Sequence, residues 1–129
     1  RYDPREVQPG MLGTAIAEFR QQGVRGINVT IPLKEEACSL ASRRSVRAQA
    51  AGAANVLTFE ADGSIEADNT DGLGMVRDLE AHGIALPGRR VMMLGAGGAA
   101  RGVVPARLDA GVAGIVVVNR TAAKAASLV

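Results

Sequence analysis

Aromatic side chains are almost missing from this sequence. Tryptophan is absent, and the aromatic residues together make up 2% of the 129 residues. Few side chains are therefore present on which nucleic-acid bases could stack. The formal net charge of +2 is also too small to indicate a surface for DNA or RNA. We expect no nucleic acid as a partner.

Cysteine is equally scarce, and long apolar runs are missing. The single cysteine, Cys38, excludes an internal disulfide and a cysteine-based metal cluster. No apolar stretch approaches the length of a membrane span, and no signal peptide is visible. The sequence therefore favours a cytoplasmic location, with neither a membrane nor a metal in its function.

The residues that are present suit a folded α/β chain. Apolar residues make up 47% of the sequence and charged residues 22%, which is enough for a core and ordinary for a globular protein. The chain starts at Arg1 without methionine and stops at Val129, where a nucleotide-binding fold would have its second helix. We therefore expect a piece of a longer enzyme, incomplete at both ends.

The most informative motif is a glycine-rich turn between two apolar runs. Val91–Leu94 has the composition of a strand buried on both faces of a parallel sheet. It leads directly into Gly95, Gly97 and Ala100, which fit the pattern G-x-G-x-x-G/A. In that pattern the glycines allow a tight turn and the close approach of a pyrophosphate, and the small third residue lets a helix pack near the strand. Because Ile115–Val118 follows at the distance of a crossover connection, these segments predict the first β-α-β unit of a Rossmann domain.

The residues after the second apolar run favour NADP over NAD. An acidic residue about 20 residues past the glycines would bond the ribose hydroxyls of NAD, but Asn119 and Arg120 stand here. The neutral amide removes a repulsion, and the guanidinium offers a partner for a 2′-phosphate. Lys124 comes within reach if a helix begins near Thr121. The alternative is that Arg120 merely faces solvent after a strand.

A turn pair, Pro87-Gly88, separates two regions of the chain. Apolar spacing and turn residues predict the elements of the first region. They are a helix that carries Leu12, Ile16 and Phe19 and is capped by Gly23, a strand over 26–31, a helix from about 33–35, a hairpin joining 56–59 to 64–66, and a helix over 71–82.

Three polar residues of the first region stand where the residues of a cleft are expected. Lys34 lies just beyond a strand end, Asn55 at the start of the hairpin and Asp71 at a helix start. A cation, an amide and a carboxylate that converge can hold a polyhydroxylated substrate and handle the proton of one hydroxyl. Each residue also has an ordinary structural interpretation. These are a solvated lysine, an amide that satisfies a turn backbone and an aspartate that caps a helix.

Several segments taken together resemble the shikimate dehydrogenase family. The resemblance runs in order from about Tyr2 to the C-terminal end, and its segments are Asn28–Lys34, Gly52–Asn55, Asp68–Gly72, Gly95–Gly102 and Asn119–Thr121. The first and third of these are far more specific than the glycine turn. The resemblance implies an NADP-dependent, reversible reduction of 3-dehydroshikimate to shikimate, on the chorismate pathway of aromatic amino acid biosynthesis.

The resemblance also implies roles for individual residues. Lys34 and Asp71 match the family's catalytic pair, and Thr30 and Asn55 match substrate contacts. The cofactor residues that match are Gly95, Ala96, Gly97, Gly98 and Ala99 for the pyrophosphate, and Asn119, Arg120, Thr121 and Lys124 for the adenosine phosphate. We expect a partial substrate-binding domain over 1–72, a linking helix and loop over 73–86, a partial Rossmann NADP-binding domain over 87–129, and a homodimer.

Some parts of the family pattern have no counterpart in this sequence. The serine pair for the substrate carboxylate is missing, as are the residues around the nicotinamide. A quinate or quinate/shikimate dehydrogenase that prefers NAD therefore stays an alternative, and so does a non-catalytic nucleotide-binding relative. Pro105 is expected to deny the nucleotide helix one backbone hydrogen bond.

Overall fold

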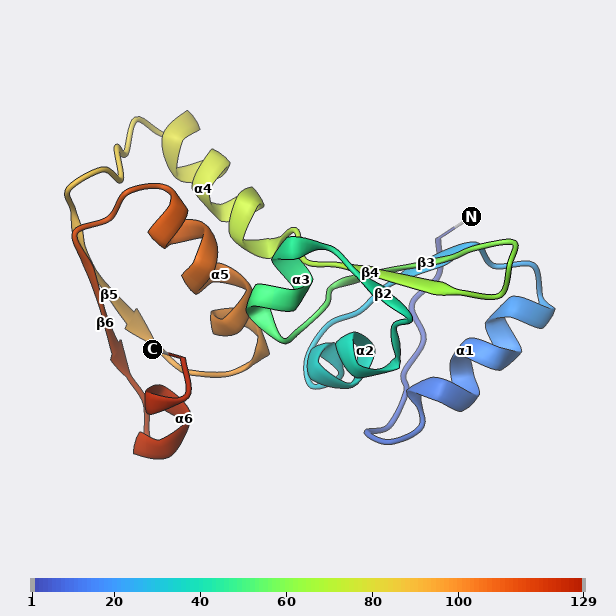
Figure 1. Ribbon diagram of the computed structural model, residues 1–129. Coiled ribbons are helices and arrows are strands. Elements are labelled where there is room, and N and C mark those ends of the chain that lie inside the picture. The colour runs from blue at the N-terminus through green and yellow to red at the C-terminus, as the bar shows by residue number, and fades with distance from the viewer. Residues whose placement is uncertain (1, 129) are drawn as a thin grey trace.

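The computed structural model describes residues 2–128 and has the α/β fold that the sequence predicts. The helices are α1 (Leu12–Gln21), α2 (Lys34–Leu40), α3 (Val46–Ala51), α4 (Asp71–Ala81), α5 (Gly98–Asp109) and α6 (Ala122–Ala126). The strands are β1 (Gly26–Asn28), β2 (Arg43–Arg44), β3 (Val56–Phe59), β4 (Ile65–Asp68), β5 (Arg90–Leu94) and β6 (Gly114–Val118). Figure 1 shows α1 and α2 beside the strands β1–β4, and α5 and α6 beside β5 and β6. Within residues 2–128, no helix combines the length and apolar character that crossing a membrane requires.

Four strands form the first sheet, in the order β1-β3-β4-β2. The predicted hairpin is confirmed as the antiparallel pair β3 and β4. Gly63 in its turn has a φ of +89°, a left-handed conformation that glycine adopts without a steric penalty. β1 pairs antiparallel with β3, whereas β2 pairs parallel with β4. The sheet is therefore mixed, and it joins segments that lie far apart in the sequence.

β1 is shorter than the strand predicted over 26–31. Its pairing with β3 ends at Asn28, although the Val29 N–H still donates to Asn55 O at 2.8 Å. The chain then turns, and the Leu33 N–H donates to Thr30 O at 3.0 Å. The turn brings the start of α2 back to the end of the strand, which is where the sequence places Lys34.

The first core lies between this sheet and the helices α1 and α2. Leu57 of β3 is fully buried in it, and Leu12 and Ile16 of α1 are 2% and 4% exposed. The spacing of these two residues along α1 is the spacing from which the helix was predicted. Cys38 of α2 is buried in the same core, as expected for a small hydrophobic side chain. Fully burying a leucine side chain stabilises a fold by about 1.5–3 kcal/mol, so this core anchors the strand ends that carry the polar residues.

Glu36 joins α2 to the start of α1. Its carboxylate oxygens accept hydrogen bonds from the Gly10 N–H at 2.8 Å and from the Leu12 N–H at 3.0 Å. N–H groups in the first turn of a helix have no partner within the helix, so a carboxylate there satisfies donors that would otherwise lack one. This contact fixes α2 against α1.

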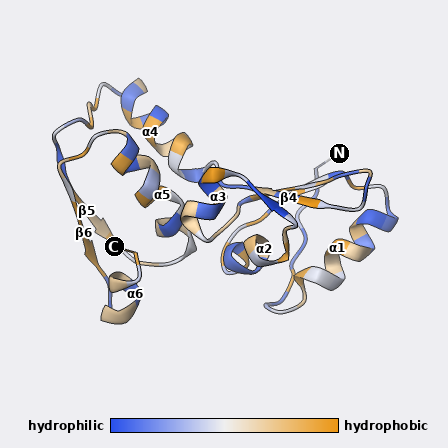
Figure 2. Ribbon diagram, in the orientation of Figure 1, coloured by the Kyte–Doolittle hydropathy of each residue, from blue (hydrophilic) through white to orange (hydrophobic). Residues whose placement is uncertain are grey.

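β5 and β6 form a second sheet, in which the two strands run parallel. Met93 packs with Val103 of α5 on one face of this sheet. On the other face Met92 and Leu94 are 68% and 80% exposed, so the prediction of a strand buried on both faces is wrong for residues 2–128. Side chains alternate between the faces of a strand, and α5 covers one face of this pair. Figure 2 shows β6 largely in hydrophobic colours although much of its surface is open.

Helix α5 also packs against α4 and α3, and glycines allow the close approach to α4. A Cβ atom on Gly72 of α4 would lie 2.4 Å from Gly102 O and 2.6 Å from Ala106 Cβ. No real side chain fits at such distances without a shift of the backbone. Pro105 lies inside α5, which continues through it and is not ended by the missing hydrogen bond.

Two short elements, α3 and β2, are not among those that the sequence predicts. α3 begins after Ser45, whose Oγ accepts a hydrogen bond from the Ala48 N–H at 3.1 Å, and it ends at Gly52 with a φ of +58°. Both cap residues are visible in the sequence, but six helical residues are too few for an apolar period to stand out. β2 has two residues and owes its conformation to pairing with β4.

Candidate active site

Lys34 is a buried cation at the first turn of α2. The residue is 8% exposed, and its Nζ donates to Asp71 Oδ2 at 2.6 Å. A lysine at a helix start is usually solvated, so the structure decides against that interpretation of Lys34. Removing water from two charges is costly unless they pair closely, which the short distance to Asp71 provides.

Asn55 completes the group of three. Its Nδ2 donates to Asp71 Oδ1 at 2.8 Å, so each carboxylate oxygen of Asp71 accepts one side-chain hydrogen bond. The Asn55 Oδ1 accepts from the Thr70 N–H at 3.0 Å. Asn55 therefore does satisfy a turn backbone, as its ordinary interpretation has it, and it binds Asp71 as well. We call Lys34, Asn55 and Asp71 the polar triad.

The structure also decides how Asp71 is used. Thr70 is the N-cap residue of α4, and Asp71 is the first residue of the helix. Thr70 makes no side-chain capping bond, the Asp71 N–H donates to Asn69 Oδ1 at 3.2 Å, and the Asp71 oxygens bind Lys34 and Asn55. The capping interpretation of Asp71 is therefore wrong.

The arrangement has a clear chemical capacity. The Lys34 ammonium has three N–H donors, and within residues 2–128 its one hydrogen bond goes to Asp71. It can therefore donate to a ligand oxygen while it stays paired with the carboxylate. Such a group can stabilise charge that develops on an oxygen atom, and the pair can hold or move a proton there.

A second carboxylate, Asp68, braces the loop that precedes Asp71. Burial opposes its ionisation, but hydrogen bonds from Arg47, Ser45 and the Asn69 N–H outweigh burial and hold the pKa of Asp68 below its usual value. The Ser45 Oγ donates to Asp68 Oδ1 at 2.5 Å, and the Arg47 Nη2 donates to Asp68 Oδ2 at 2.5 Å. Because Ser45 caps α3, these bonds tie α3 to the end of β4.

The glycine turn lies at the carboxyl end of β5, directly before α5. Gly95 has a φ of +105°, which strongly favours glycine, and its N–H donates to Val118 O at 2.8 Å. Gly97 has a φ of −93° and a ψ of −172°, which any residue adopts. A Cβ atom on Gly97 would meet nothing within 4 Å. The protein itself therefore leaves the space in front of Gly97 free.

The start of α5 fits a pyrophosphate. The first N–H groups of a helix lack intrahelical acceptors and lie at its positive end, where anions bind. Ala96 is buried, and Gly97 and Ala99 are exposed beside this end. The free space at Gly97 and the donors of α5 meet the requirements of a dinucleotide phosphate.

The residues after β6 lie at the same edge of the second sheet. Asn119 donates through Nδ2 to Thr121 O at 2.8 Å, which shapes the turn into α6. α6 begins after its N-cap Thr121, as the reach of Lys124 requires. Arg120 and Lys124 are both exposed. A side chain that binds a 2′-phosphate must be accessible, so this exposure is compatible with that role. It equally fits the alternative that Arg120 merely faces solvent.

The glycine turn and the polar triad are neighbours in the structure. A Cβ atom on Gly98, the first residue of α5, would lie 3.4 Å from Lys34 Cβ. On the outer side of this contact, Arg101 Nε lies 3.5 Å from Glu35 Oε1, within ion-pair distance. Residues predicted for the substrate and for the cofactor thus converge. Thr30, the remaining predicted substrate contact, is exposed on the turn before α2.

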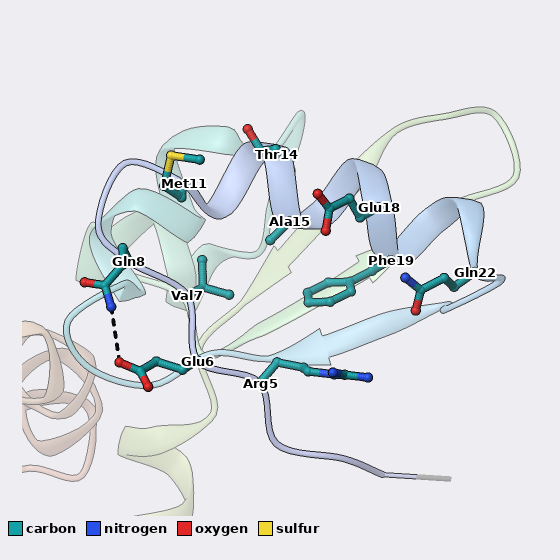
Figure 3. A pocket seen from close by; sticks show the side chains of 10 residues that line it. All are labelled: Arg5, Glu6, Val7, Gln8, Met11, Thr14, Ala15, Glu18, Phe19 and Gln22. Atoms are coloured by element: carbon teal, nitrogen blue, oxygen red, sulfur yellow. Dashed lines mark hydrogen bonds between the residues drawn. The ribbon is translucent and has the colours of Figure 1, made fainter.

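A separate cavity lies on the far side of the first region. A hollow of about 350 Å³ separates the N-terminal segment from α1. Figure 3 shows its lining, in which Gln8 donates to Glu6 at 3.1 Å and Phe19 supplies an apolar wall. Arg5, Glu6 and Gln8 are exposed, so the hollow holds no buried polar group of the kind found at Lys34. Within residues 2–128, no cluster of three or more metal-ligand side chains is present.

Comparison with known proteins finds similarity to shikimate dehydrogenases. A family model of the shikimate dehydrogenase substrate binding domain matches residues 1–57. The shikimate dehydrogenase (NADP(+)) of Xanthomonas oryzae pv. oryzae is 51% identical over 128 residues, 98% of this chain and 45% of that protein. That of Verminephrobacter eiseniae is 52% identical over 130 residues, 100% of this chain and 45% of that protein. Over nearly all of its length the chain is similar to shikimate dehydrogenases.

Solved structures of the family share the fold. Shikimate dehydrogenase from Aquifex aeolicus has a TM-score of 0.86 at 36% identity, over 95% of this chain and 46% of that chain. Shikimate 5-dehydrogenase from Thermus thermophilus, in complex with NADP(H) and shikimate, has a TM-score of 0.82 at 38% identity, over 95% of this chain and 45% of that chain. A 5-ketofructose reductase of Gluconobacter sp. strain CHM43 also matches, with a TM-score of 0.80 at 31% identity, over 96% of this chain and 44% of that chain. The present chain thus spans about half the length of these shikimate dehydrogenase relatives.

Proposed function

We propose that the protein is an NADP-dependent shikimate dehydrogenase that reversibly reduces 3-dehydroshikimate to shikimate. The observation that carries the proposal is the polar triad, in which Asp71 accepts from the buried Lys34 and from Asn55, placed against the first residue of α5. Relatives about 51% identical over nearly all of this chain bear that name.

The polar triad would bind and orient the oxygen on substrate C3. Lys34 Nζ donates to that oxygen while Asp71 keeps the ammonium in place. When bound, the nicotinamide takes up or supplies the hydride at C3. The proton of the C3 oxygen passes through Lys34 and Asp71, which we treat as one coupled pair. Asn55 would hold a neighbouring hydroxyl, and Thr30 would contact the substrate from the turn before α2.

The cofactor residues divide into two sets. In the first, Gly95, Ala96, Gly97, Gly98 and Ala99 would hold the pyrophosphate at the start of α5. In the second, Asn119, Arg120, Thr121 and Lys124 would hold the adenosine ribose and its 2′-phosphate. The free space at Gly97 supports the first assignment, and the exposure of Arg120 is compatible with the second. With these roles go a substrate-binding domain over 1–72, a linker over 73–86 and an NADP-binding domain over 87–129.

A second candidate is the reduction of another polyhydroxylated ketone. The 5-ketofructose reductase has the same fold over 96% of this chain, so the fold alone does not select the substrate. A quinate/shikimate dehydrogenase that prefers NAD is the nearer alternative. Both alternative enzymes would use the polar triad in the same way, and they would differ in the residues that contact the rest of the substrate and the cofactor.

One assay separates these candidates. The complete natural polypeptide is given shikimate or quinate with NADP⁺ or NAD⁺, and 5-ketofructose with NADPH or NADH, while reduced nicotinamide is followed by absorbance. We expect the highest kcat/KM for shikimate with NADP⁺. A preference for quinate with NAD⁺, or for 5-ketofructose, would replace the proposal by that alternative. Absence of turnover with every pair, while NADPH still binds, would leave a nucleotide-binding protein. Cytoplasmic location and a homodimer belong to the same proposal, and cell fractionation and sedimentation test them.

A further inference from the structure

Asn69 is a buried polar side chain to which the proposed reaction gives no role. Within residues 2–128, the buried polar or charged residues are Lys34 and Asn69, and Asn69 is 2% exposed. Its Nδ2 donates to Ala53 O at 2.9 Å, and its Oδ1 accepts from the Asp71 N–H at 3.2 Å. A buried amide that makes both bonds costs little, and its loss leaves a buried carbonyl and a helix N–H without partners.

These bonds reach all three members of the polar triad through the backbone. Asp71 is held directly by its N–H. Ala53 belongs to the short loop that carries Asn55. The next residue of that loop, Ala54, donates its N–H to Lys34 O at 2.8 Å. One amide side chain thus connects the start of α4 with the loop that touches the start of α2.

Helix α5 closes the remaining side of the Asn69 amide. A Cβ atom on Gly102 would lie 2.6 Å from Asn69 Oδ1, 2.8 Å from Nδ2 and 3.0 Å from Cγ. The amide therefore rests against the backbone of the helix whose first turn would bind the pyrophosphate. The amide occupies the space that a side chain at position 102 would need, so glycine is the residue that fits there without a shift.

We propose that Asn69 is a positioning residue, whose amide sets the place of the Asp71 carboxylate relative to Lys34 and Asn55. Asn69 does not touch the substrate, and Gly102 provides the clearance that its amide needs. The kinetic part of this inference rests on the proposed dehydrogenase function. Its structural part concerns the Asp71 N–H and stands independently of the substrate.

The first test replaces the amide in the complete natural polypeptide. For Asn69→Ala we expect kcat with shikimate and NADP⁺ to fall about 10- to 100-fold, since a misplacement of about 1 Å at reacting groups costs on that scale. The KM for NADP⁺ should stay within about two-fold, because the glycine turn is untouched. An unchanged kcat, measured well below the melting temperature of the variant, would overturn the positioning role even if the variant melts earlier.

The second test approaches the amide from α5. Gly102→Ala should displace Asn69 and lower kcat in the same direction. The matched control is Gly74→Ala on α4, where an added Cβ meets nothing within 4 Å, and it should leave kcat unchanged. In the double variant Asn69→Ala with Gly102→Ala, the new methyl finds the vacated space. Its further effect on kcat should therefore be small, whereas independent losses that multiply would contradict the proposed clearance.

Hydrogen exchange at the Asp71 amide separates this inference from the proposed function. Measured by NMR without substrate, exchange at Asp71 should be faster in Asn69→Ala and in Gly102→Ala than in Gly74→Ala or the natural protein. If the natural protein does not oxidise shikimate, the proposed function fails, and faster exchange still supports the Asn69 contact. If shikimate is oxidised but exchange at Asp71 is unaltered by Asn69→Ala, the Asn69 inference fails alone.

Discussion

The two regions of the chain build their candidate sites in opposite ways. In the first region the site consists of side chains that bond to one another, with Asp71 accepting from Lys34 and Asn55. In the second region it consists of backbone and space, with a left-handed Gly95 and nothing within 4 Å of a Cβ on Gly97. Arg120, the side chain assigned to a phosphate, is exposed. The side chains of the first site already bond to one another, whereas the second site is open space at the start of a helix.

This difference indicates where substitutions should act. A preformed arrangement of charges lowers a reaction barrier because it needs no reorganisation during the reaction, so changes to it should reduce kcat. The open glycine turn would contribute binding energy to the cofactor, so changes to it should reduce cofactor affinity and leave the fold intact. Variants in the first region should therefore change kcat, whereas variants in the second region should change the dissociation constant of the cofactor.

The largest expected effect comes from breaking the polar triad. Lys34→Ala and Asp71→Asn should each lower kcat/KM for shikimate by about 10²-fold or more, the scale of a positioned acid–base group. Because the two residues act as a unit, the double variant should lose much less than the product of the single losses. Steady-state rates of the complete natural polypeptide measure both effects.

Asp78→Asn is the matched control for Asp71→Asn. Asp78 lies on the same helix α4, and its side chain is 75% exposed. It should leave kcat/KM unchanged. Full activity of Asp71→Asn with an unchanged melting temperature would reduce Asp71 to a structural residue and remove the preformed site from the comparison.

The next largest effect is expected from a side chain that fills the open space at Gly97. Gly97→Val should weaken NADPH binding at least about 100-fold, because its side chain takes the space in which a pyrophosphate meets the backbone. The fold should tolerate valine, since the φ of −93° suits any residue and a Cβ atom placed there meets nothing within 4 Å. Titration of NADPH and the melting temperature without cofactor check both parts.

Gly114→Val at the start of β6 makes the same exchange of side chains in another open place. It should bind NADPH normally. Undiminished NADPH affinity in Gly97→Val would show that the free space at the glycine turn is not a cofactor site.

The sequence predicts the polar triad better than it predicts how the triad is held. Lys34, Asn55 and Asp71 stand at element ends, and strand pairing together with the turn before α2 brings those ends together. The packing of Asn69 against Gly102 could not be read from the sequence, because it joins residues 33 positions apart that belong to different predicted regions. The bonds of Glu36 to the start of α1 could not be read either, because they join a side chain to backbone N–H groups 24 and 26 positions away, and no sequence pattern marks such a pair.

In the second region local patterns predicted the elements and misjudged their surroundings. The β-α-β order, the glycine turn and the start of α6 are all present. Exposure of Met92 and Leu94 was not expected, because an apolar run shows that a strand can be buried without showing what covers it. α3 was missed since six residues carry cap signals but no period.

A smaller effect sharpens the assignment of the exposed residues after β6. Arg120→Ala should weaken NADPH binding by about 1–3 kcal/mol, the range for a lost hydrogen bond to a charged group. NADH binding should barely change, since that cofactor has no 2′-phosphate. Arg77→Ala, at another exposed arginine on α4, should alter neither. Equal losses for the two cofactors would show that Arg120 does not bind the 2′-phosphate.

The smallest effect tests whether the first region is as tightly braced as its contacts indicate. Asp68 has a lowered pKa in the folded protein because Arg47, Ser45 and the Asn69 N–H bind its carboxylate, against the opposing effect of burial. A lowered folded pKa contributes stability that is present above the unfolded value, about 3.9, and is lost as the pH falls through the folded value. Asp68→Asn should therefore lower the free energy of unfolding by about 1 kcal/mol at neutral pH, where the charged hydrogen bonds are formed. Urea unfolding across a pH series should show this difference shrinking below about pH 4, where the unfolded chain begins to take up the proton, and lost below the lowered pKa of Asp68 in the folded protein. A pH-independent difference would mean that Asp68 contributes through packing, and that its charge does not brace the loop before Asp71.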